Sequence, residues 1–367
     1  MEQCGLTFHT TEQGTPYWDE SVYYEFSPAQ VDCIEQATYA LNAMCLEAVE
    51  HVIHNKLWDE FRIPQNLGPW ISQSWETEER TIIGRFDLAY TGEGTPRLLE
   101  YNADTPTSLL EAAVIQWQWY RERFADDSKI DQFNAIHERL IEAWSQLQEE
   151  YQTLPILTFL TMESMDEDDI TTTYLRDTAV QAGWLTEQLD MAKLGYDAGS
   201  NNFVGSYNRP VDVAFKLYPW EWMVRESFGK YLTLNRTRWL EPPWKMILSN
   251  KALLPMLWKL FPGSPYLLEA SWEPLACDYV RKPIFGREGN NVTMMKGGVA
   301  IAETRTEYDD GPAVYQALAE LTPIGGYHTV VIGSWMVNGY AAGMGLREDS
   351  SLILGNLARF VPHIIQS

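Results

Sequence analysis

The chain has 367 residues, a net charge of −24 and 45% apolar residues, a composition typical of a folded globular protein with one large core or several modest lobes. The strong negative charge disfavours roles in binding nucleic acid or anionic membrane surfaces, and no apolar run reaches the roughly 18 residues of a membrane span. With no signal-like N-terminus and four widely spaced cysteines, we expect a cytoplasmic protein with reduced thiols.

The first predicted element is a long helix after Ser27. Ser27, Pro28 and Gln30 form the pattern of a helix start, with a capping serine, a proline in the first turn and a glutamine that can bond back to the cap. Apolar residues from Ile34 to Val52 then recur at helical spacing. This helix is expected to line the first lobe of the protein.

The segment GRFDLAYTGEGTPRLLEYNAD is predicted to form a β-hairpin. A turn centred in its GEG run pairs Asp87 with Glu100 and Arg85 with Asn102, so all four side chains lie on one face. Directly opposed residues have Cβ atoms roughly 5 Å apart, so the two carboxylates can share one hard cation, and Asn102 can add an uncharged oxygen. The alternative is a solvated polar face with an ordinary arginine–carboxylate pair.

A helix start directly follows the hairpin. Residues 104–111, DTPTSLLE, combine capping residues with a proline, and the helix is expected to run from about Thr107 to Phe124. The free amides and the positive dipole end of a helix N-terminus favour an anion. A carboxylate-bearing strand that ends beside such a helix start suits a magnesium–nucleotide site.

The rest of the chain alternates between helical and strand patterns. After a helix over residues 137–152, an α/β unit is predicted from a buried strand over 155–162, a helix over 168–183 and a strand over 211–218. Farther on, residues 275–303 are expected to form two strands joined by a glycine-containing loop, and residues 327–349 to form antiparallel strands.

Four segments resemble one enzyme family. GRFD, LLEYNADTP, LSNKALLPMLW and KPIFGREGNNV resemble, in this order and over nearly the whole chain, the synthetase domain of glutathionylspermidine synthase and its stand-alone homologues, which are ATP-grasp carboxylate-amine ligases. The segments FHT, YWDE and RFVPHII are similar to the stand-alone homologues, and we therefore expect no amidase domain. The resemblance implies an α+β, ATP-grasp-like fold with mixed and antiparallel sheets and a pre-ATP-grasp α/β region.

The lobes are expected to be interleaved parts of a single catalytic unit over residues 1–367. The N-terminal lobe would cover residues 1–153 and carry the metal-binding hairpin at 81–105. The pre-ATP-grasp-like region would follow over 154–235. The nucleotide-binding lobe would occupy 236–367, with a lid loop at 282–292.

Lys282 begins the run KPIFGREGNN, where a lysine at a strand end can reach nucleotide phosphates while Gly286 and Gly289 let backbone amides approach closely. The run does not match GxxxxGK[ST], which excludes a P-loop. The resemblance implies a lid over ATP here, with Lys282 and Lys251 as phosphate contacts. The alternative for Lys251 is a plain helix start after Ser249.

The resemblance also implies roles for three residues elsewhere in the chain. It places Gln316 at the adenine base, where the alternative is an ordinary surface glutamine. It makes Arg347 a late active-site arginine that can hold a phosphate. The alternative for Arg347 is a salt bridge with Glu348 or Asp349. Arg85 would stabilise the transferring phosphoryl group or the oxyanion of a tetrahedral intermediate, because arginine keeps its charge.

The implied activity is that of an ATP-dependent acid–amine ligase that works through an acyl phosphate. ATP and Mg²⁺ would be the cofactors, with Asp87, Glu100 and Asn102 as metal ligands. The partners would be a small-molecule acid, either a peptide or an amino acid, and an amine such as a polyamine. Leu217 stands where the family has a threonine contact, and Thr105 replaces a serine, so the acid need not be glutathione.

Two other classes remain open from the residues. One is an ATP-dependent phosphotransferase, although the sequence lacks the HRD and DFG motifs of protein kinases. The other is a non-catalytic protein that binds a nucleotide or a polyamine. Analysis of the reaction products separates the first from a ligase.

Overall fold

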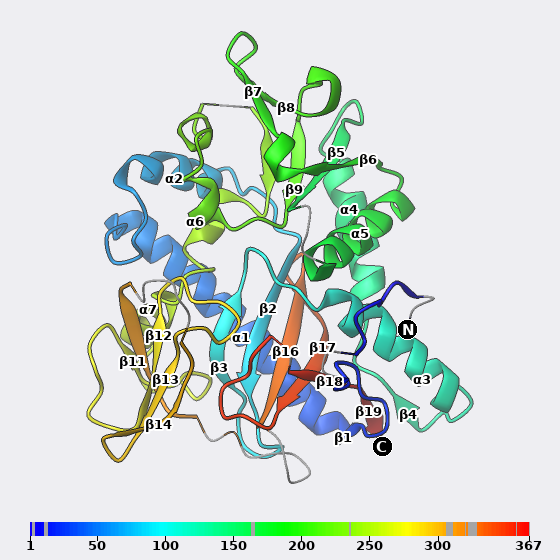
Figure 1. The fold of residues 1–367 in the computed structure, drawn as a ribbon, viewed down its shortest axis with the longest axis vertical. Helices are drawn as coiled ribbons and strands as arrows, with labels where there is room; N and C mark the ends of the chain where they lie inside the picture. Colours follow the sequence, from blue (N-terminus) through cyan, green and yellow to red (C-terminus); the bar gives the residue numbers. More distant parts are fainter. Residues whose placement is uncertain are drawn as a thin grey trace.

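The computed structural model describes residues 1, 4–10, 14–162, 166–234, 236–305, 311–319, 321, 329–356 and 358–366. Tyr327 and His328, which the sequence assigns to a strand, lie outside these ranges. Within them, helices and five β-sheets form a mixed helix-and-sheet architecture (Figure 1). This confirms the expected α+β class.

The central sheet joins the predicted hairpin to the C-terminal strands. Its strand order is β18-β17-β16-β2-β3, with every neighbouring pair antiparallel. The strands are β2 (Ile83–Ala89), β3 (Arg97–Asn102), β16 (Thr329–Val337), β17 (Tyr340–Asp349) and β18 (Arg359–Val361). The first long helix, α1 (Pro28–Asn55), packs against this sheet (Figure 1).

The start of α1 has the predicted capping box. The Ser27 hydroxyl accepts a hydrogen bond from the Gln30 backbone N–H, and the Gln30 Oε1 accepts one from the Ser27 N–H at 2.8 Å. Buried residues from Val31 to Val52 form the stripe that faces the core. The helix prediction is therefore confirmed at its start and along its apolar face.

The hairpin has the predicted register at its four polar residues. Across β2 and β3, Arg85 lies opposite Asn102, and Asp87 lies opposite Glu100. Since alternate residues of a strand share a face, the four side chains are placed together.

A β-bulge interrupts the hairpin directly below these pairs. Leu88 pairs with Leu98, so Leu99 is the extra residue of β3, and the symmetric register expected from the turn does not continue. The Leu99 carbonyl accepts a hydrogen bond from Lys282 Nζ at 2.8 Å, and the Leu98 N–H donates to Tyr266 at 2.9 Å. The Lys282 bond thus connects this edge strand to another sheet, and the Tyr266 bond connects it to the turn that precedes that sheet.

A parallel sheet of order β10-β9-β5-β6 lies above the central sheet in Figure 1. Its strands are β5 (Ile156–Thr161), β6 (Leu185–Asp190), β9 (Val213–Lys216) and β10 (Arg238–Leu240). The helices α4 (Ile136–Gln148) and α5 (Asp166–Gln181) pack together, with α5 also on β5 and β6. The strand order reverses between β5 and β9, and ligands bind at the carboxyl ends of parallel strands at such a switch point.

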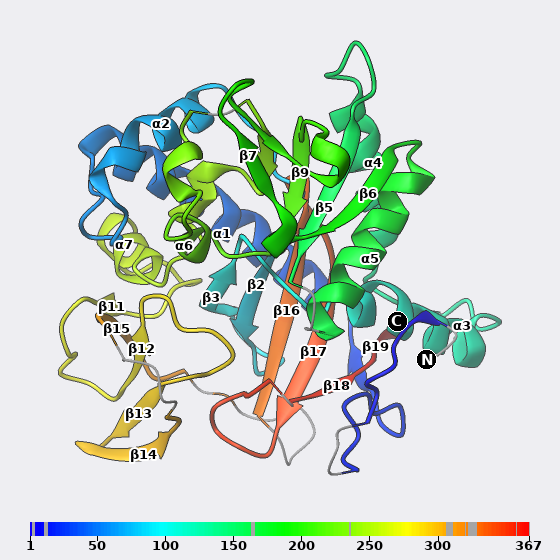
Figure 2. The ribbon, with the colours of Figure 1, turned by 45° about the horizontal axis from the view of Figure 1, so that its top comes forward.

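A third sheet, of order β11-β15-β12-β13-β14, lies beside helix α7 (Leu253–Leu260) (Figure 2). Its strands are β11 (Ala270–Ser271), β12 (Tyr279–Pro283), β13 (Thr293–Lys296), β14 (Val299–Glu303) and β15 (Ala313–Ala317). The expected two strands within 275–303 are in fact three. Gly297 and Gly298 both have a positive φ and turn β13 back into β14.

The helix after the hairpin begins later than expected and is not uniform. Ser108 has a φ of +65°, so the helical residues start at Leu109. A π-helical turn (Glu111–Ile115) precedes α3 (Gln116–Phe124).

The smaller elements are β1 (Tyr24–Phe26), α2 (Gly68–Glu76), β4 (Ile130–Asp131), β7 (Gly195–Asp197), β8 (Asn202–Val204), α6 (Trp220–Met223) and β19 (His363–Gln366).

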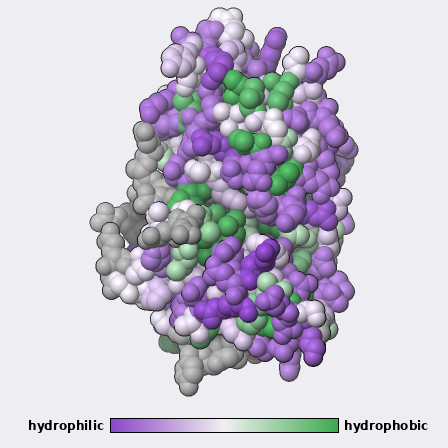
Figure 3. Space-filling model, turned by 90° about the vertical axis from the view of Figure 1, so that its right-hand side faces the viewer, coloured by the Kyte–Doolittle hydropathy of each residue, from purple (hydrophilic) through white to green (hydrophobic). Residues whose placement is uncertain are grey.

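The face that carries α4 and α5 is mainly hydrophilic, with apolar side chains in small separate groups (Figure 3). Within the described ranges, no helix is both long and apolar enough to span a bilayer.

The start of β2 is held by a buried ion pair. Glu241 Oε1 accepts hydrogen bonds from the N–H groups of Ile82 and Ile83 at 3.0 and 2.9 Å. Lys245 Nζ lies 2.8 Å from Glu241 Oε2, and both side chains are almost fully buried. This pair connects the central sheet to the segment that follows β10.

We predict that Lys245→Met lowers the free energy of unfolding by about 3 kcal/mol, because it leaves the Glu241 carboxylate buried without its cation. Urea denaturation of the purified variant measures the change. Lys259→Met, at an exposed lysine of α7, is the matched control and should unfold like the wild type. Equal urea midpoints for the two variants would contradict the role of this pair.

Candidate active site

A cavity of about 250 Å³ opens where the central, parallel and third sheets converge. All ten residues that the family resemblance assigns to the site line it: Arg85, Asp87, Glu100, Asn102, Lys251, Lys282, Gly286, Gly289, Gln316 and Arg347. They come from β2, β3, β12, β15, β17, the turn before α7 and the loop after β12. The fold therefore brings together residues that are far apart in the sequence.

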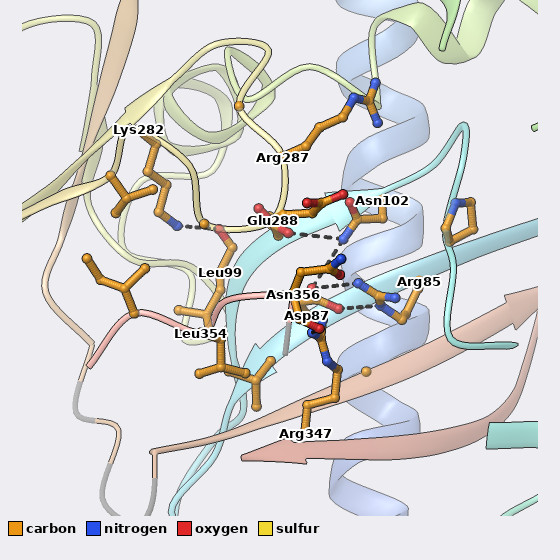
Figure 4. Close-up of a pocket in the computed structure, with 18 of the residues that line it drawn as sticks. Arg85, Asp87, Leu99, Asn102, Lys282, Arg287, Glu288, Arg347, Leu354 and Asn356 are labelled. Atoms are coloured by element: carbon orange, nitrogen blue, oxygen red, sulfur yellow. Dashed lines mark hydrogen bonds and ion pairs between the residues drawn. The ribbon is translucent and has the colours of Figure 1, made fainter. Parts of the chain in front are cut away.

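Arg85 and Asp87 form a two-pronged ion pair on β2 (Figure 4). Arg85 Nε donates to Asp87 Oδ1 at 2.7 Å, and a terminal nitrogen donates to Oδ2 at 3.0 Å. The other terminal nitrogen donates to the Thr107 carbonyl at 2.7 Å, which fixes the start of the following helix relative to β2. Burial raises the pKa of Asp87, and the Arg85 guanidinium opposes that shift.

Asn102 lies between the two carboxylates of the hairpin. Its Nδ2 donates to Asp87 Oδ2 at 3.2 Å and to Glu100 Oε1 at 3.1 Å. The sequence predicted that Asn102 would present its oxygen here. In the structure the Asn102 amide instead presents its nitrogen, because the two negatively charged oxygens of Asp87 and Glu100 need a hydrogen-bond donor. A cation would take the place of this NH₂ group, with the amide rotated to offer Oδ1.

Two lysines surround Glu100. Lys251 Nζ lies 2.9 Å from Glu100 Oε2 and also donates to the Gly286 carbonyl at 2.6 Å. Burial would raise the pKa of Glu100, but Lys251 and Lys282 hold it well below its ordinary value. Glu100 is therefore a permanent anion in the cavity.

Lys282 is buried, and among the described residues its hydrogen-bond partners are uncharged acceptors. Its Nζ donates to the Leu99 carbonyl at 2.8 Å and to Gln316 Oε1 at 2.7 Å, while Gln316 Nε2 donates to the Leu98 carbonyl. Burial lowers the pKa of Lys282 to about 8, against the attraction of Glu100. A ligand anion would compensate this lysine directly.

Gly289 packs the loop after β12 against the C-terminal part of the chain. Its φ is +67°, and a Cβ there would approach the Leu354 carbonyl oxygen to 2.4 Å. A residue with a side chain would have to displace one of the two segments. Lys251, through Gly286, holds the other end of the same loop.

Arg347 lies at the cavity wall formed by β17 (Figure 4). It donates to the carbonyls of Gly355 and Asn356 at 2.9 and 3.4 Å. Glu348 points to the other face of the strand, where it pairs with Arg359. Asp349 accepts hydrogen bonds from the backbone N–H groups of Ser351 and Gly355. Among the described residues, Arg347 therefore forms neither of the alternative salt bridges, with Glu348 or with Asp349.

Arg287 lies within the glycine-rich run but was not predicted from the sequence as a site residue. Arg287 donates to Thr105 Oγ1 at 3.0 Å and pairs with Glu221. It thereby joins the loop after β12 to the helix α6. Attention to the charged residue between the two glycines of that run would have found it.

A fully buried ion pair between Lys216 and Asp104 was also not predicted from the sequence. Lys216 Nζ lies 2.6 Å from Asp104 Oδ1, and Asp104 Oδ2 accepts a hydrogen bond from the Trp220 N–H at 2.9 Å. A lysine within the apolar strand pattern of β9 is a sequence feature that would have indicated a buried ion pair. The pair connects the end of the hairpin to the end of the parallel sheet.

The sequence pattern of a family described as glutathionylspermidine synthase preATP-grasp matches residues 1–366. A Haemophilus influenzae protein provisionally named acid–amine ligase is 39% identical over 364 residues, which cover 96% of this chain and 92% of that protein. Trypanothione synthetase of Crithidia fasciculata is 30% identical, over 91% of this chain and 55% of the enzyme. The bifunctional glutathionylspermidine synthetase/amidase of Escherichia coli is 26% identical, over 94% and 59%. The chain thus spans little more than half of these two larger relatives.

Among solved structures, a glutathione synthetase-like effector of Globodera pallida superposes with a TM-score of 0.62. The match covers 94% of this chain and 89% of the effector at 11% sequence identity. A similarity at this level of identity shows the fold alone.

The lowered pKa of Lys282 predicts a pH dependence of stability. Between pH 8 and the ordinary lysine pKa near 10.4, the unfolded chain holds a proton that the folded protein has released, so stability rises with pH. Lys282→Met lacks this contribution. The unfolding free energy of the wild type relative to the variant should therefore increase by up to about 3 kcal/mol over that range. A difference that stays constant in urea titrations from pH 7 to 10 would contradict the assignment.

Proposed function

Because the chain belongs to the glutathionylspermidine synthase family, we propose that it is an ATP-dependent ligase of the ATP-grasp type that joins a small-molecule acid to an amine. One observation carries this proposal. A single cavity holds two opposed carboxylates, an asparagine and several cationic side chains, a combination that suits a magnesium–triphosphate ligand.

The residues present fit a magnesium site. The Asn102 NH₂ group already lies within hydrogen-bonding distance of one oxygen of Asp87 and one of Glu100, so both oxygens face a common point. Asp87, Glu100 and Asn102 would hold the ion. Bound magnesium would neutralise phosphate charge and help to align the reacting groups.

The cationic side chains are placed around these carboxylates. Lys251 and Lys282 would contact the phosphates of ATP, under the loop that carries Gly286 and Gly289. Gln316, next to Lys282, would lie on the path toward the base. Arg85 and Arg347 would face the transferred phosphoryl group, where fixed positive charge lowers the barrier.

The proposed reaction has two steps. A carboxylate oxygen of the acid bonds to the γ-phosphorus as the bond to the departing ADP breaks, which gives an acyl phosphate. The amine nitrogen then attacks the acyl carbon, the bond to phosphate breaks, and the nitrogen loses a proton. The amide and inorganic phosphate are released. Positioning and electrostatic stabilisation supply most of the rate.

The names of the relatives support the choice of substrates. They describe an acid–amine ligase and enzymes that make trypanothione and glutathionylspermidine. A peptide or amino acid is accordingly the proposed acid, and a polyamine is a candidate amine. The larger relatives are covered only in part, so their particular substrates are not assigned to this chain.

We predict that Glu100→Gln lowers magnesium-dependent ATP turnover at least 100-fold while the fold remains intact, because the change removes ligand charge but preserves size. ADP release, with circular dichroism as the check on folding, measures it. Glu93→Gln, at the exposed turn of the same hairpin, is the matched control and should keep full activity. Normal turnover of Glu100→Gln would contradict the site.

The reaction class is tested by trapping the activated acid. With an accepted acid, ATP, magnesium and hydroxylamine, the protein should form a hydroxamate, because hydroxylamine attacks acyl phosphates. Arg85→Ala should suppress this product more than it weakens ATP binding, since the Arg85 contact would strengthen in the transition state. A phosphorylated alcohol formed in step with ADP, without hydroxamate from any acid, would instead establish a phosphotransferase.

A further inference from the structure

We propose that Trp222 and Leu217 form the wall that selects the acid substrate, and that this wall favours an acid with an apolar or aromatic side group. The proposal rests on the proposed ligase function and adds the chemical class of one substrate. The first observation that supports it is the exposure of a tryptophan in the cavity. Trp222 is 45% exposed, yet it lines the cavity.

The wall is formed by a short stretch of chain that follows β9. Leu217 directly follows the strand and is buried, Pro219 comes next along the cavity, and Trp222 lies in α6. The Trp222 ring packs edge-on against Tyr218 with centroids 5.7 Å apart. The Tyr218 contact holds the ring in place, and the exposed part of the ring contributes apolar surface to the cavity.

The wall lies where a parallel sheet binds ligands. Leu217 follows β9, and Asp168 lies at the start of α5, beyond the carboxyl end of β5. These two strands flank the switch point of the parallel sheet. The part of the cavity lined by the third sheet carries Lys282 and Gln316, the residues proposed for the nucleotide. The part with Trp222 thus remains for the second substrate.

Arg287 places a hydrogen-bond donor beside the apolar wall. Its guanidinium carbon lies 5.7 Å from the centroid of the Trp222 ring. The terminal nitrogens bond to Thr105 and Glu221, but Nε is buried and has no hydrogen-bond partner among the residues described. A carbonyl or carboxylate oxygen would satisfy this donor, and an acid or peptide supplies such an oxygen.

The apolar wall and the Arg287 donor together would select acid substrates by the polarity of their side group. A substrate side group that packs on Trp222 and Leu217 exchanges water for an indole ring and an aliphatic side chain, so a hydroxyl or carboxylate placed against them would lose its own hydrogen bonds. An aliphatic or aromatic group gains contact area instead. The acid is therefore a peptide or amino acid with an apolar group, held through an oxygen by Arg287.

Dipeptides in which one residue varies test the wall. The two series Xaa-Gly and Gly-Xaa, with Gly, Ser, Leu or Phe as the variable residue, are assayed for ADP release with hydroxylamine as the nucleophile. In at least one series, kcat/KM for Leu and Phe should exceed that for Gly and Ser at least tenfold, mainly through KM. Trp222→Ala should abolish this preference and leave the KM for ATP within twofold. Trp222→Phe should retain it.

Trp117→Ala is the matched control, because Trp117 is an exposed tryptophan on α3 and does not line the cavity. The control should keep the preference.

Calorimetric binding of the same dipeptides, in the presence of a non-hydrolysable ATP analogue, separates the proposed ligase function from the proposed wall. Preferential binding without turnover would contradict the ligase function for these acids but support the wall. A preference that survives in Trp222→Ala, a preference for serine, or no binding by the apolar dipeptides would overturn the wall.

Discussion

The pairing of β2 with β3 is the constraint on which the site depends. It places Arg85, Asp87, Glu100 and Asn102 on one face, and a slip of one residue would turn each side chain of a strand to the opposite face. The register is fixed from both sides, because β2 also pairs with β16. There, Gly333 lies opposite Asp87, and a Cβ at Gly333 would come within 2.9 Å of the Arg85 side chain. Glycine at this position lets the arginine lie across the sheet.

Charge balance explains how so many ionised groups occupy one cavity. Each hairpin carboxylate already has a cationic partner, Arg85 for Asp87 and Lys251 for Glu100, while the Asn102 amide bridges the two. Burial of an uncompensated charge would be costly, so these pairs keep the site folded without a ligand. A metal–nucleotide complex could then exchange partners with groups that are already in place, which limits the reorganisation needed during the reaction.

The local part of this arrangement could be predicted from the sequence. Strand periodicity and a glycine-rich turn gave the pairs Arg85–Asn102 and Asp87–Glu100, and a cap pattern gave the start of α1. The bulge at Leu99 could not be predicted, because its partners come from the third sheet. The ion pair between Asp104 and Lys216 joins residues 112 positions apart, and Arg287 gains its role only through contacts with Thr105 and Glu221. Such long-range contacts depend on the packing of whole sheets.

The face of this hairpin is proposed to hold a metal–nucleotide complex. Anomalous diffraction from crystals soaked with Mn²⁺ and a non-hydrolysable ATP analogue tests it most directly, because manganese replaces magnesium at oxygen ligands and can be located by its own signal. An anomalous peak is expected between the carboxylates of Asp87 and Glu100, with Asn102 rotated to offer its oxygen and the phosphates reaching Lys282. A peak elsewhere, with the Asn102 nitrogen still donating to both carboxylates, would contradict it.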